Sequence, residues 1–514
     1  MCQHIPAPVM FNAAVSVLLI QLAHRPVPLR TGIGLAHDAV TTSSTQAQAF
    51  YDQGLAYLHS YVWLEAARSF NQALTFDANV AMAYTGLSVA YTELNDGDAA
   101  REALATARRL AARASERERI WIEARALQME AERAPTDAVK LSAYRASLER
   151  AVQKYPADEE FWLARGMAES GDPGERGQGS RASSEVFYKK ALALAPSHFA
   201  AHHFLAHAYE NTNRPDEALV ESETYARMAP NIPHARHMHG HELRRLGRVE
   251  EAIAEFQAAD EIDSAYLKRE SIPPAEDWHY LHNLDLLGTS YQYLGQMTRA
   301  EAVLKQSFAV PSSSLEQQFN KREWPVFLIA RGRAAEALTA SNALATQASP
   351  LVSAIGHIQA GEARLALHQP RAAVDDYNAA LRLMKGREGA GLLAAALRQL
   401  QGELWLAMGQ REAAHGALRQ TIGEVRQRPG PDEWIQATFT LESIARASRD
   451  AGDWEFAAWA AQQMMEHDPN YGGAHYAAAL VAQHNHDEQT ARREFAAARR
   501  LWANADPDVL KLVP

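Results

Sequence analysis

Alanine-rich apolar segments recur along this 514-residue chain, and each follows a polar turn and another predicted helix. Glu65–Ala73 is one such segment. The segments end in similar short sequences. Ala-Pro, for example, ends one segment at Pro196 and another at Pro230, 34 residues later. The helix before each turn carries a small residue where two helices must touch, namely Gly54, Gly240, Gly288, Gly361 or Gly402. This pattern predicts an array of helical hairpins rather than one globular core.

The spacing of the small residues is similar to that of the tetratricopeptide repeat (TPR), which has small residues at its eighth, twentieth and twenty-seventh positions. Gly54, Ala66 and Ala73 occupy these positions in one unit, and Gly361, Ala373 and Ala380 do so in another. The resemblance covers about residues 45–505 and implies an all-α, right-handed superhelical solenoid of helix–turn–helix repeats. A hairpin this short cannot bury its apolar face alone, so neighbouring hairpins must stack.

The repeat frame also predicts the organisation of the chain. We expect an N-terminal segment over 1–40, N-terminal repeats over 41–157, a central histidine-rich block over 158–310 and C-terminal repeats over 311–514. Individual units begin near Ala47, Ala81, Glu159, Phe199, Pro233, Leu281, Ala354, Ala395, Thr438 and Gly472. Gly171–Ser183 is predicted to be a flexible loop, and the prolines of Ser271–Glu276 to end one helix before the next begins.

Composition narrows the functional classes. The net charge of -11 and the absence of long basic runs argue against nucleic acid as a partner. The single cysteine, Cys2, excludes intramolecular disulfides and metal sites built on two or more thiolates. The apolar run Pro8–Ala23 is short for a membrane span and has the length of a signal-peptide core, but no cationic segment precedes it. The first 40 residues are therefore expected to be a signal peptide or a disordered start, and the sequence leaves open whether the protein is exported, for example to a periplasm, or cytoplasmic.

Histidines concentrate in the middle of the chain, where eight of the 21 fall between residues 198 and 241. His203, His207 and Glu210 share one helical face, because spacings of four and seven residues place them within about 60° of one another. His234, His237 and His241 share a face of the next unit, and His282 and Asp285 follow in the third. In the TPR frame these positions belong to the first helix of each unit, which faces the concave groove of TPR proteins.

Other histidines fit simpler roles. His202 and His239 fall where large core residues belong in the repeat, so we expect them to pack. His198 is expected to cap or flank a helix start, and His475, His484 and His486 share no face.

The same stretches resemble a group of bacterial TPR proteins that carry HxxxHxxE, HxxHxxxH and HNxH motifs in successive repeats. The matching strings here are His203–Glu210, His234–His241 and His282-Asn283-Leu284, and Thr41–Leu55 is similar to the opening of that group. Asp285 stands where the group has its last histidine, and Trp63 replaces a histidine of the first repeat. The group supplies no activity to carry over.

Imidazole is the commonest protein metal ligand, and a pair at i and i+4 on a helix can chelate one ion. We therefore predict one or two transition-metal ions held by His203, His207, Glu210, His234, His237, His241, His282 and Asp285. The nitrogen-rich, sulfur-free set suits Zn, Fe, Cu, Ni or Mn, and some members would instead orient ligands or transfer protons.

Catalytic motifs are missing from the sequence, which has no P-loop, no G-x-S-x-G elbow, no H-E-x-x-H and no C-x-x-C-H. The sequence therefore leaves open whether the protein is an enzyme and which reaction it would catalyse. The alternative function is that of an adaptor or scaffold whose groove binds a peptide or a partner protein, with the histidines forming a solvated polar surface.

Overall fold

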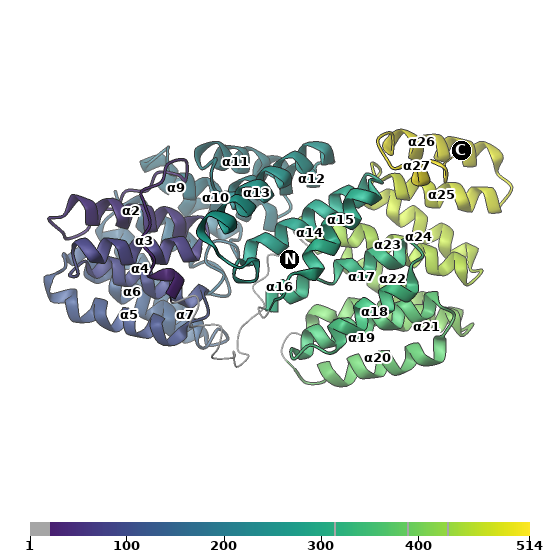
Figure 1. Ribbon diagram of the computed structural model, residues 1–514, viewed down its shortest axis with the longest axis horizontal. Coiled ribbons are helices and arrows are strands. Elements are labelled where there is room, and N and C mark those ends of the chain that lie inside the picture. The colour runs from purple at the N-terminus through teal and green to yellow at the C-terminus, as the bar shows by residue number, and fades with distance from the viewer. Residues whose placement is uncertain (1–20, 313–314, 388–389, 429–430, 514) are drawn as a thin grey trace. The chain divides into compact units, whose positions relative to one another are not determined.

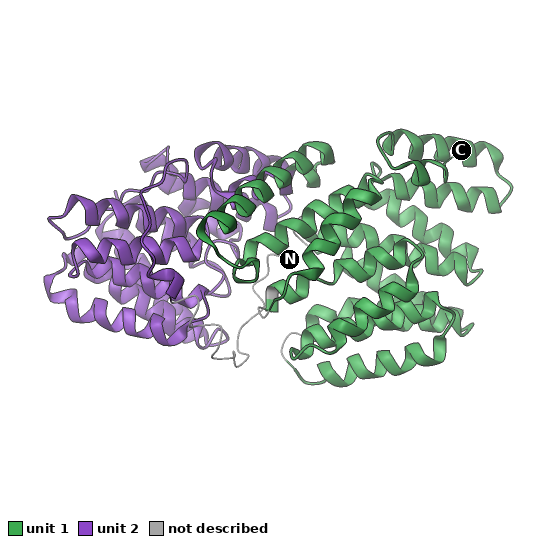
Figure 2. Ribbon diagram, viewed as in Figure 1, with its two compact units in different colours: residues 1, 243–514 green, residues 2–242 purple. Residues whose placement is uncertain are grey.

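The computed structural model describes residues 21–312, 315–387, 390–428 and 431–513. These residues form helices joined by short turns, with no strand among them, as the repeat pattern predicts. They divide between Glu242 and Leu243 into two compact units, here called the N-terminal unit (residues 2–242) and the C-terminal unit (residues 243–514) (Figure 2). The predicted block boundaries at 157/158 and 310/311 stay a prediction.

The N-terminal unit comprises the following helices, of which α12 continues past the division: α2 (Thr45–His59), α3 (Trp63–Phe76), α4 (Ala81–Glu93), α5 (Gly97–Leu110), η1 (Ala111–Arg113), α6 (Glu116–Glu132), α7 (Ala138–Lys154), α8 (Glu159–Met167), η2 (Ala182–Ser184), α9 (Glu185–Leu194), α10 (Phe199–Asn211), α11 (Pro215–Met228) and α12 (Pro233–Arg245).

The C-terminal unit comprises α13 (Val249–Glu270), η3 (Pro274–Glu276), α14 (Trp278–Tyr293), α15 (Met297–Ala309), α16 (Leu315–Asn320), α17 (Glu323–Ala330), α18 (Ala334–Ala345), α19 (Pro350–Ala366), α20 (Pro370–Met384), η4 (Ala390–Leu393), α21 (Ala394–Ala407), α22 (Arg411–Val425), α23 (Pro431–Asp450), α24 (Trp454–His467), α25 (Gly472–His484), α26 (Glu488–Leu501) and α27 (Pro507–Leu510). None of the described helices combines the length and the apolar character that a membrane crossing needs.

Consecutive helices pack as hairpins, for example α2 on α3 and α4 on α5 in one unit and α19 on α20 in the other (Figure 1). The predicted small residues lie at these contacts. A Cβ atom at Gly54 would lie 2.6 Å from the Phe70 ring, and one at Gly288 would lie 2.6 Å from the Leu304 side chain. A side chain at either position would push the two helices of the hairpin apart, which explains why glycine stands there.

The turns within the hairpins share a residue with a left-handed backbone. It is Asn95, Asn213, Gly295 or Gly409 in four of the hairpins, with φ between 57° and 76°. Glycine and asparagine adopt this conformation at little cost. Tyr61 occupies the corresponding turn between α2 and α3 with φ 59°, which is unusual for a bulky side chain.

Two segments that were expected to be disordered or flexible make specific contacts with neighbouring helices. Residues 21–40 pack on the N-terminal unit: the Asn71 amide donates to the Ala23 carbonyl oxygen (3.0 Å), and Arg68 donates to that of Pro26 (2.8 Å). The Asn231 backbone N–H donates to the carbonyl oxygen of Gly32 (2.8 Å). Residues 1–20 lie outside the described part of the chain, so export stays a prediction.

The loop Gly171–Ser183 was predicted to be flexible, and this prediction is wrong. Arg176 is buried and pairs with Glu93 (Nε to Oε1, 2.6 Å), and the Ser180 hydroxyl lies 2.6 Å from that of Tyr188. A buried guanidinium with its carboxylate partner fixes the loop, a contact between distant segments that local composition does not reveal. The break at Ser271–Glu276 is confirmed, since α13 ends at Glu270 and α14 begins at Trp278.

Candidate metal centre

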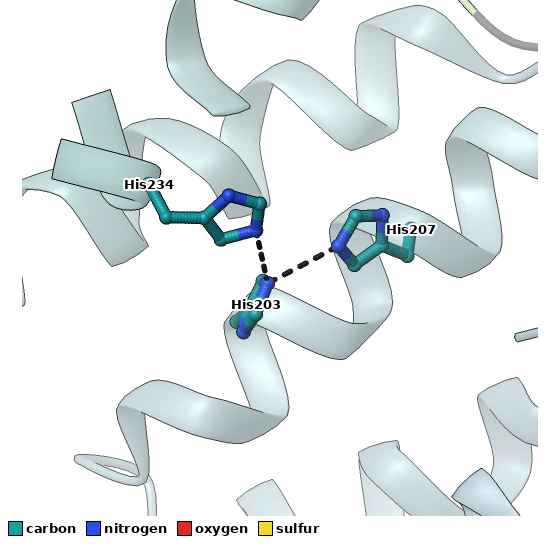
Figure 3. A group of neighbouring side chains, drawn as sticks. All are labelled: His203, His207 and His234. Carbon is teal, nitrogen blue, oxygen red and sulfur yellow. Dashed lines mark hydrogen bonds between the residues drawn. The ribbon is translucent and has the colours of Figure 1, made fainter. Parts of the chain in front are cut away.

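Three imidazoles converge in the N-terminal unit. His203 and His207 lie one turn apart on α10, and His234 lies in the first turn of α12. The His203 Nε2 atom is 3.1 Å from the Nε2 atoms of both His207 and His234 (Figure 3). The helical spacing of His203 and His207 and the stacking of the next repeat thus bring together three of the predicted ligands. His203, His207 and His234 are here called the histidine trio.

Hydrogen bonds on the far side of two rings set which nitrogen carries the proton. The His203 Nδ1–H donates to the backbone carbonyl oxygen of His59 (2.7 Å), because a carbonyl can only accept. The His207 Nδ1–H donates to a carboxylate oxygen of Glu210 (3.2 Å). In the neutral state each ring then presents the Nε2 lone pair to the centre of the trio.

Two lone pairs that face each other at 3.1 Å repel unless a cation lies between them. Zinc–nitrogen bonds of 2.0–2.1 Å in a tetrahedral site place two ligand nitrogens about 3.3 Å apart, and octahedral geometry about 2.9 Å. The separations in the histidine trio lie between these values. Burial, followed by the nearby His207, lowers the pKa of His203 well below its usual range, so protonation of this ring is disfavoured.

The trio is enclosed by other side chains. The TPR frame had predicted that these histidines face an open groove. His203 is 0% exposed, and His207 and His234 are each 1% exposed. The Tyr61 ring lies over the trio, with its centroid 4.8 Å from that of His203 and 5.2 Å from that of His234. Tyr225 stacks on the His203 ring at 4.5 Å. Aromatic rings therefore replace solvent around these nitrogens.

Glu210, a predicted ligand, holds imidazoles in place in this structure. Its Oε2 accepts from His207 Nδ1 (3.2 Å) and its Oε1 lies 3.0 Å from His241 Nδ1. Burial raises the pKa of Glu210, but the hydrogen bonds from His207 and His241 outweigh it and lower the pKa to about 2. The carboxylate is therefore ionised and joins α10 to α12. Ligation by Glu210 itself stays a prediction.

The remaining predicted ligands on α12 continue this column of imidazoles. His237 is 0% exposed and His241 is 1% exposed, and their ring centroids are 4.3 Å apart. His237 lies 5.8 Å from His234, centroid to centroid. Both residues are therefore close to the trio, and their role as ligands stays a prediction.

His282 and Asp285 lie on α14 of the C-terminal unit. The His282 Nε2 is 3.7 Å from a carboxylate oxygen of Asp432 on α23. Asp285 accepts a hydrogen bond from the Ser307 hydroxyl on α15 (3.1 Å), and burial raises its pKa well above the usual range. Their part in metal binding stays a prediction.

Three other histidines were expected to have structural roles, with His202 and His239 packing in the core and His198 capping or flanking a helix. His202 is only half-buried, and its Nδ1 lies 2.5 Å from Glu221 rather than among core side chains; His239 is also half-buried. His198 is the N-cap residue of α10, as expected, but its side chain makes no capping bond. Instead its Nε2 lies 3.1 Å from a carboxylate oxygen of Glu160.

Tyr61 was missed altogether, although the sequence holds a signal for it. The residue stands at the turn position where the hairpins above have glycine or asparagine. A bulky side chain kept in a strained turn conformation often marks a functional constraint. His59 was missed for another reason, since its backbone carbonyl, not its side chain, anchors His203.

Comparison with known proteins agrees with the repeat. Residues 233–266 match the family model of the tetratricopeptide repeat. No match was found among curated proteins. A tetratricopeptide repeat protein from Parabacteroides merdae ATCC 43184 is similar in structure, with 16% identity over 53% of this chain and 98% of its own and a TM-score of 0.36.

Two further solved structures are similar over more of the chain. The apo form of the quorum sensor NprR from B. thuringiensis has 12% identity over 75% of this chain and 97% of its own, with a TM-score of 0.44. A human IFIT1 dimer with PPP-AAAA has 10% identity over 90% and 92% of the two chains, with a TM-score of 0.36. The described residues thus have the helical-hairpin fold of tetratricopeptide-repeat proteins, with a match to the family's repeat at residues 233–266.

Proposed function

We propose that this protein binds a divalent transition-metal ion through the histidine trio. The observation that carries the proposal is the convergence of three Nε2 atoms, with 3.1 Å between His203 and each of the other two. The Nδ1–H groups of His203 and His207 are already engaged by a carbonyl and a carboxylate, which is how metal-binding imidazoles are usually oriented.

The donor set narrows the metal. Three imidazoles without a thiolate suit Zn(II), Cu(II), Ni(II) or Fe(II), with Mn(II) less favoured. Three protein ligands leave at least one coordination position of a tetrahedral ion for water or another small ligand. Tyr61 covers the trio, so any such ligand must be small or must displace this ring.

The test is the metal content of the full chain purified without a histidine tag. We expect at least one equivalent of transition metal after reconstitution with Zn(II), and a loss of one equivalent in His207→Gln and in His234→Gln. The matched control is His202→Gln, which changes the neighbouring imidazole on α10 that pairs with Glu221 instead. Less than about 0.2 equivalents of any metal in the reconstituted wild type, or no loss in the trio variants, contradicts the proposal.

A second candidate function, binding of a peptide or a partner protein, is favoured by a cavity in the C-terminal unit. The cavity has a volume of about 170 Å³ and is lined by successive first helices of hairpins, α19, α21 and α23. Ile358 supplies an apolar wall, while Glu362 and Gln399 supply hydrogen-bonding groups. Such a mixture suits a peptide segment with alternating side-chain character.

Pull-downs with a tagged full chain separate the two functions. Partner binding in this cavity should be lost in Ile358→Arg and unchanged in His207→Gln. Retention of the same partners by Ile358→Arg would exclude the cavity as their binding site.

A further inference from the structure

A second cluster of metal-binding side chains lies in the N-terminal unit. It consists of His59, the last residue of α2, Glu160, near the start of α8, and His198, the N-cap of α10. One ring nitrogen of each histidine and a carboxylate oxygen of Glu160 all lie within 4.8 Å of one another. We call this group the acidic cluster.

The carboxylate of Glu160 is shared between the two rings. Its Oε1 is 3.1 Å from His198 Nε2, and its Oε2 is 3.1 Å from His59 Nε2. Two ligand atoms at 2.0–2.2 Å from one ion lie about 2.9–3.5 Å apart in octahedral or tetrahedral geometry. The nitrogen–oxygen separations of the acidic cluster lie in this interval, and the three ligand atoms all lie within 4.8 Å of one another.

The cluster is buried. His59, Glu160 and His198 are 7%, 6% and 8% exposed. Arg117 pairs with both Asp38 (2.6 Å) and Asp158 (2.5 Å). A divalent ion between Glu160 and the imidazoles would compensate the buried charge of the Glu160 carboxylate.

From this geometry we propose that the acidic cluster is a second metal site with two imidazole ligands and one carboxylate ligand. It would take a divalent first-row metal ion and, because it includes an oxygen ligand, would accept Mn(II) or Fe(II) more readily than the histidine trio. Two histidines and one carboxylate leave coordination positions open for water. This second site does not depend on an ion being bound at the trio.

The two sites nevertheless share one residue. The carbonyl oxygen of His59 accepts the proton of His203 Nδ1 (2.7 Å), while the His59 side chain belongs to the acidic cluster. An ion at the acidic cluster would hold the end of α2 in place and, with it, the orientation of one trio ligand. Filling the acidic cluster should therefore tighten binding at the trio.

The experiment measures bound Zn(II) per full chain after chelator treatment and reloading. We expect two equivalents in the wild type and one in Glu160→Gln and His198→Gln, with Glu159→Gln as the matched control on the same helix. His207→Gln should also retain one equivalent, at the acidic cluster. Circular dichroism must show unchanged helix content in each variant.

The outcomes separate this proposal from that for the trio. If Glu160→Gln and His198→Gln bind as much metal as the wild type, the acidic cluster is an ion pair closed by protons and the second site does not exist. A single ion that is lost in Glu160→Gln but kept in His207→Gln would overturn the trio and support the acidic cluster.

A second measurement covers variants that fail to fold. His207→Gln loaded with one equivalent of Mn(II) should show nitrogen couplings from imidazole in pulsed electron paramagnetic resonance. Mn(II) without such couplings in this background would overturn the second site, and no change within the acidic cluster is needed for this test.

Discussion

The two units use the same hairpin repeat but place different chemistry on its first helices. In the N-terminal unit, α10 and α12 bury imidazoles against one another, with His203, His207 and His234 at most 1% exposed. In the C-terminal unit, α19, α21 and α23 instead line a cavity of about 170 Å³ with polar side chains such as Glu362 and Gln399. The helix contacts depend on glycines and apolar residues at other positions, so the repeat backbone tolerates both arrangements.

The electrostatics of the units differ in the same way. Glu210 is ionised, because hydrogen bonds from two imidazoles lower its pKa to about 2 against the effect of burial. In the C-terminal unit, burial and then the nearby Glu403 raise the pKa of Glu362 to about 8. The first arrangement prepares ligands for a cation, whereas the second keeps a carboxylic acid neutral.

The largest expected difference between the units is the effect of removing metal. An ion present at 1,000 times its dissociation constant stabilises the folded state by about 4.1 kcal/mol. Chelation should therefore lower the unfolding temperature of the N-terminal unit and leave that of the C-terminal unit unchanged. Scanning calorimetry of the full chain with Zn(II) or with chelator measures both transitions, and an equal shift of the two would contradict a site confined to residues 2–242.

A second comparison is between the turn at Tyr61 in the N-terminal unit and the corresponding turn at Gly409 in the C-terminal unit. Tyr61→Asn removes a buried ring, at a cost of about 3–5 kcal/mol, and relieves a left-handed backbone worth about 1–2 kcal/mol. We expect a net loss of about 1–4 kcal/mol and faster release of the bound ion. Denaturant unfolding and metal release to a chromogenic chelator measure the two effects.

The matched control is Gly409→Tyr in the C-terminal unit, where φ is 76° and nothing lies within 4 Å of the added Cβ. This substitution introduces only the backbone strain of about 1–2 kcal/mol. Unchanged metal release in Tyr61→Asn would show that the ring does not close the trio.

The smallest expected effects are opposite pH dependences in the metal-free protein. The raised pKa of Glu362 keeps it protonated in the folded chain, so its stabilising contribution is complete below about pH 4.5 and is lost as pH rises through about 8. The lowered pKa of His203 gives the reverse, with a contribution present above about pH 6.5 and lost as pH falls below it. Each slope is at most about 1.4 kcal/mol per pH unit.

These slopes are tested by measuring unfolding free energies at pH 5, 6.5 and 8 and subtracting the value for each variant from that for the wild type. Glu362→Gln should flatten the alkaline side and His203→Gln the acidic side, while Glu412→Gln, an exposed carboxylate on α22, should change neither. Parallel profiles for wild type and Glu362→Gln would show that this carboxyl is already ionised in the folded state.

Much of the fold was predictable because its determinants are local. The start of a unit, the small residues at helix contacts and the paired prolines before α14 follow from positions within about 34 residues. The pairing of His203 with His207 follows from helix geometry, and His234 joins them because adjacent repeats stack in register.

Contacts across many repeats were not predictable. His59 and Glu160 are 101 residues apart, and five α-helices and the short helix η1 lie between α2 and α8 in the chain. The packing of Arg176 against Glu93 likewise depends on where the 171–183 loop crosses other helices. No sequence period encodes such contacts, because they depend on the accumulated rotation of the stacked hairpins.

A TPR array and the phase of its histidines could be predicted from the residues alone, because both depend on repeat length and on the 3.6-residue helical turn. Tertiary structure alone decided that the trio is buried, that Tyr61 covers it, and that Glu210 holds two imidazoles. It also decided that His59, Glu160 and His198 meet at all. Burial and hydrogen-bond partners arise from side chains of distant helices, and only the packed structure brings those together.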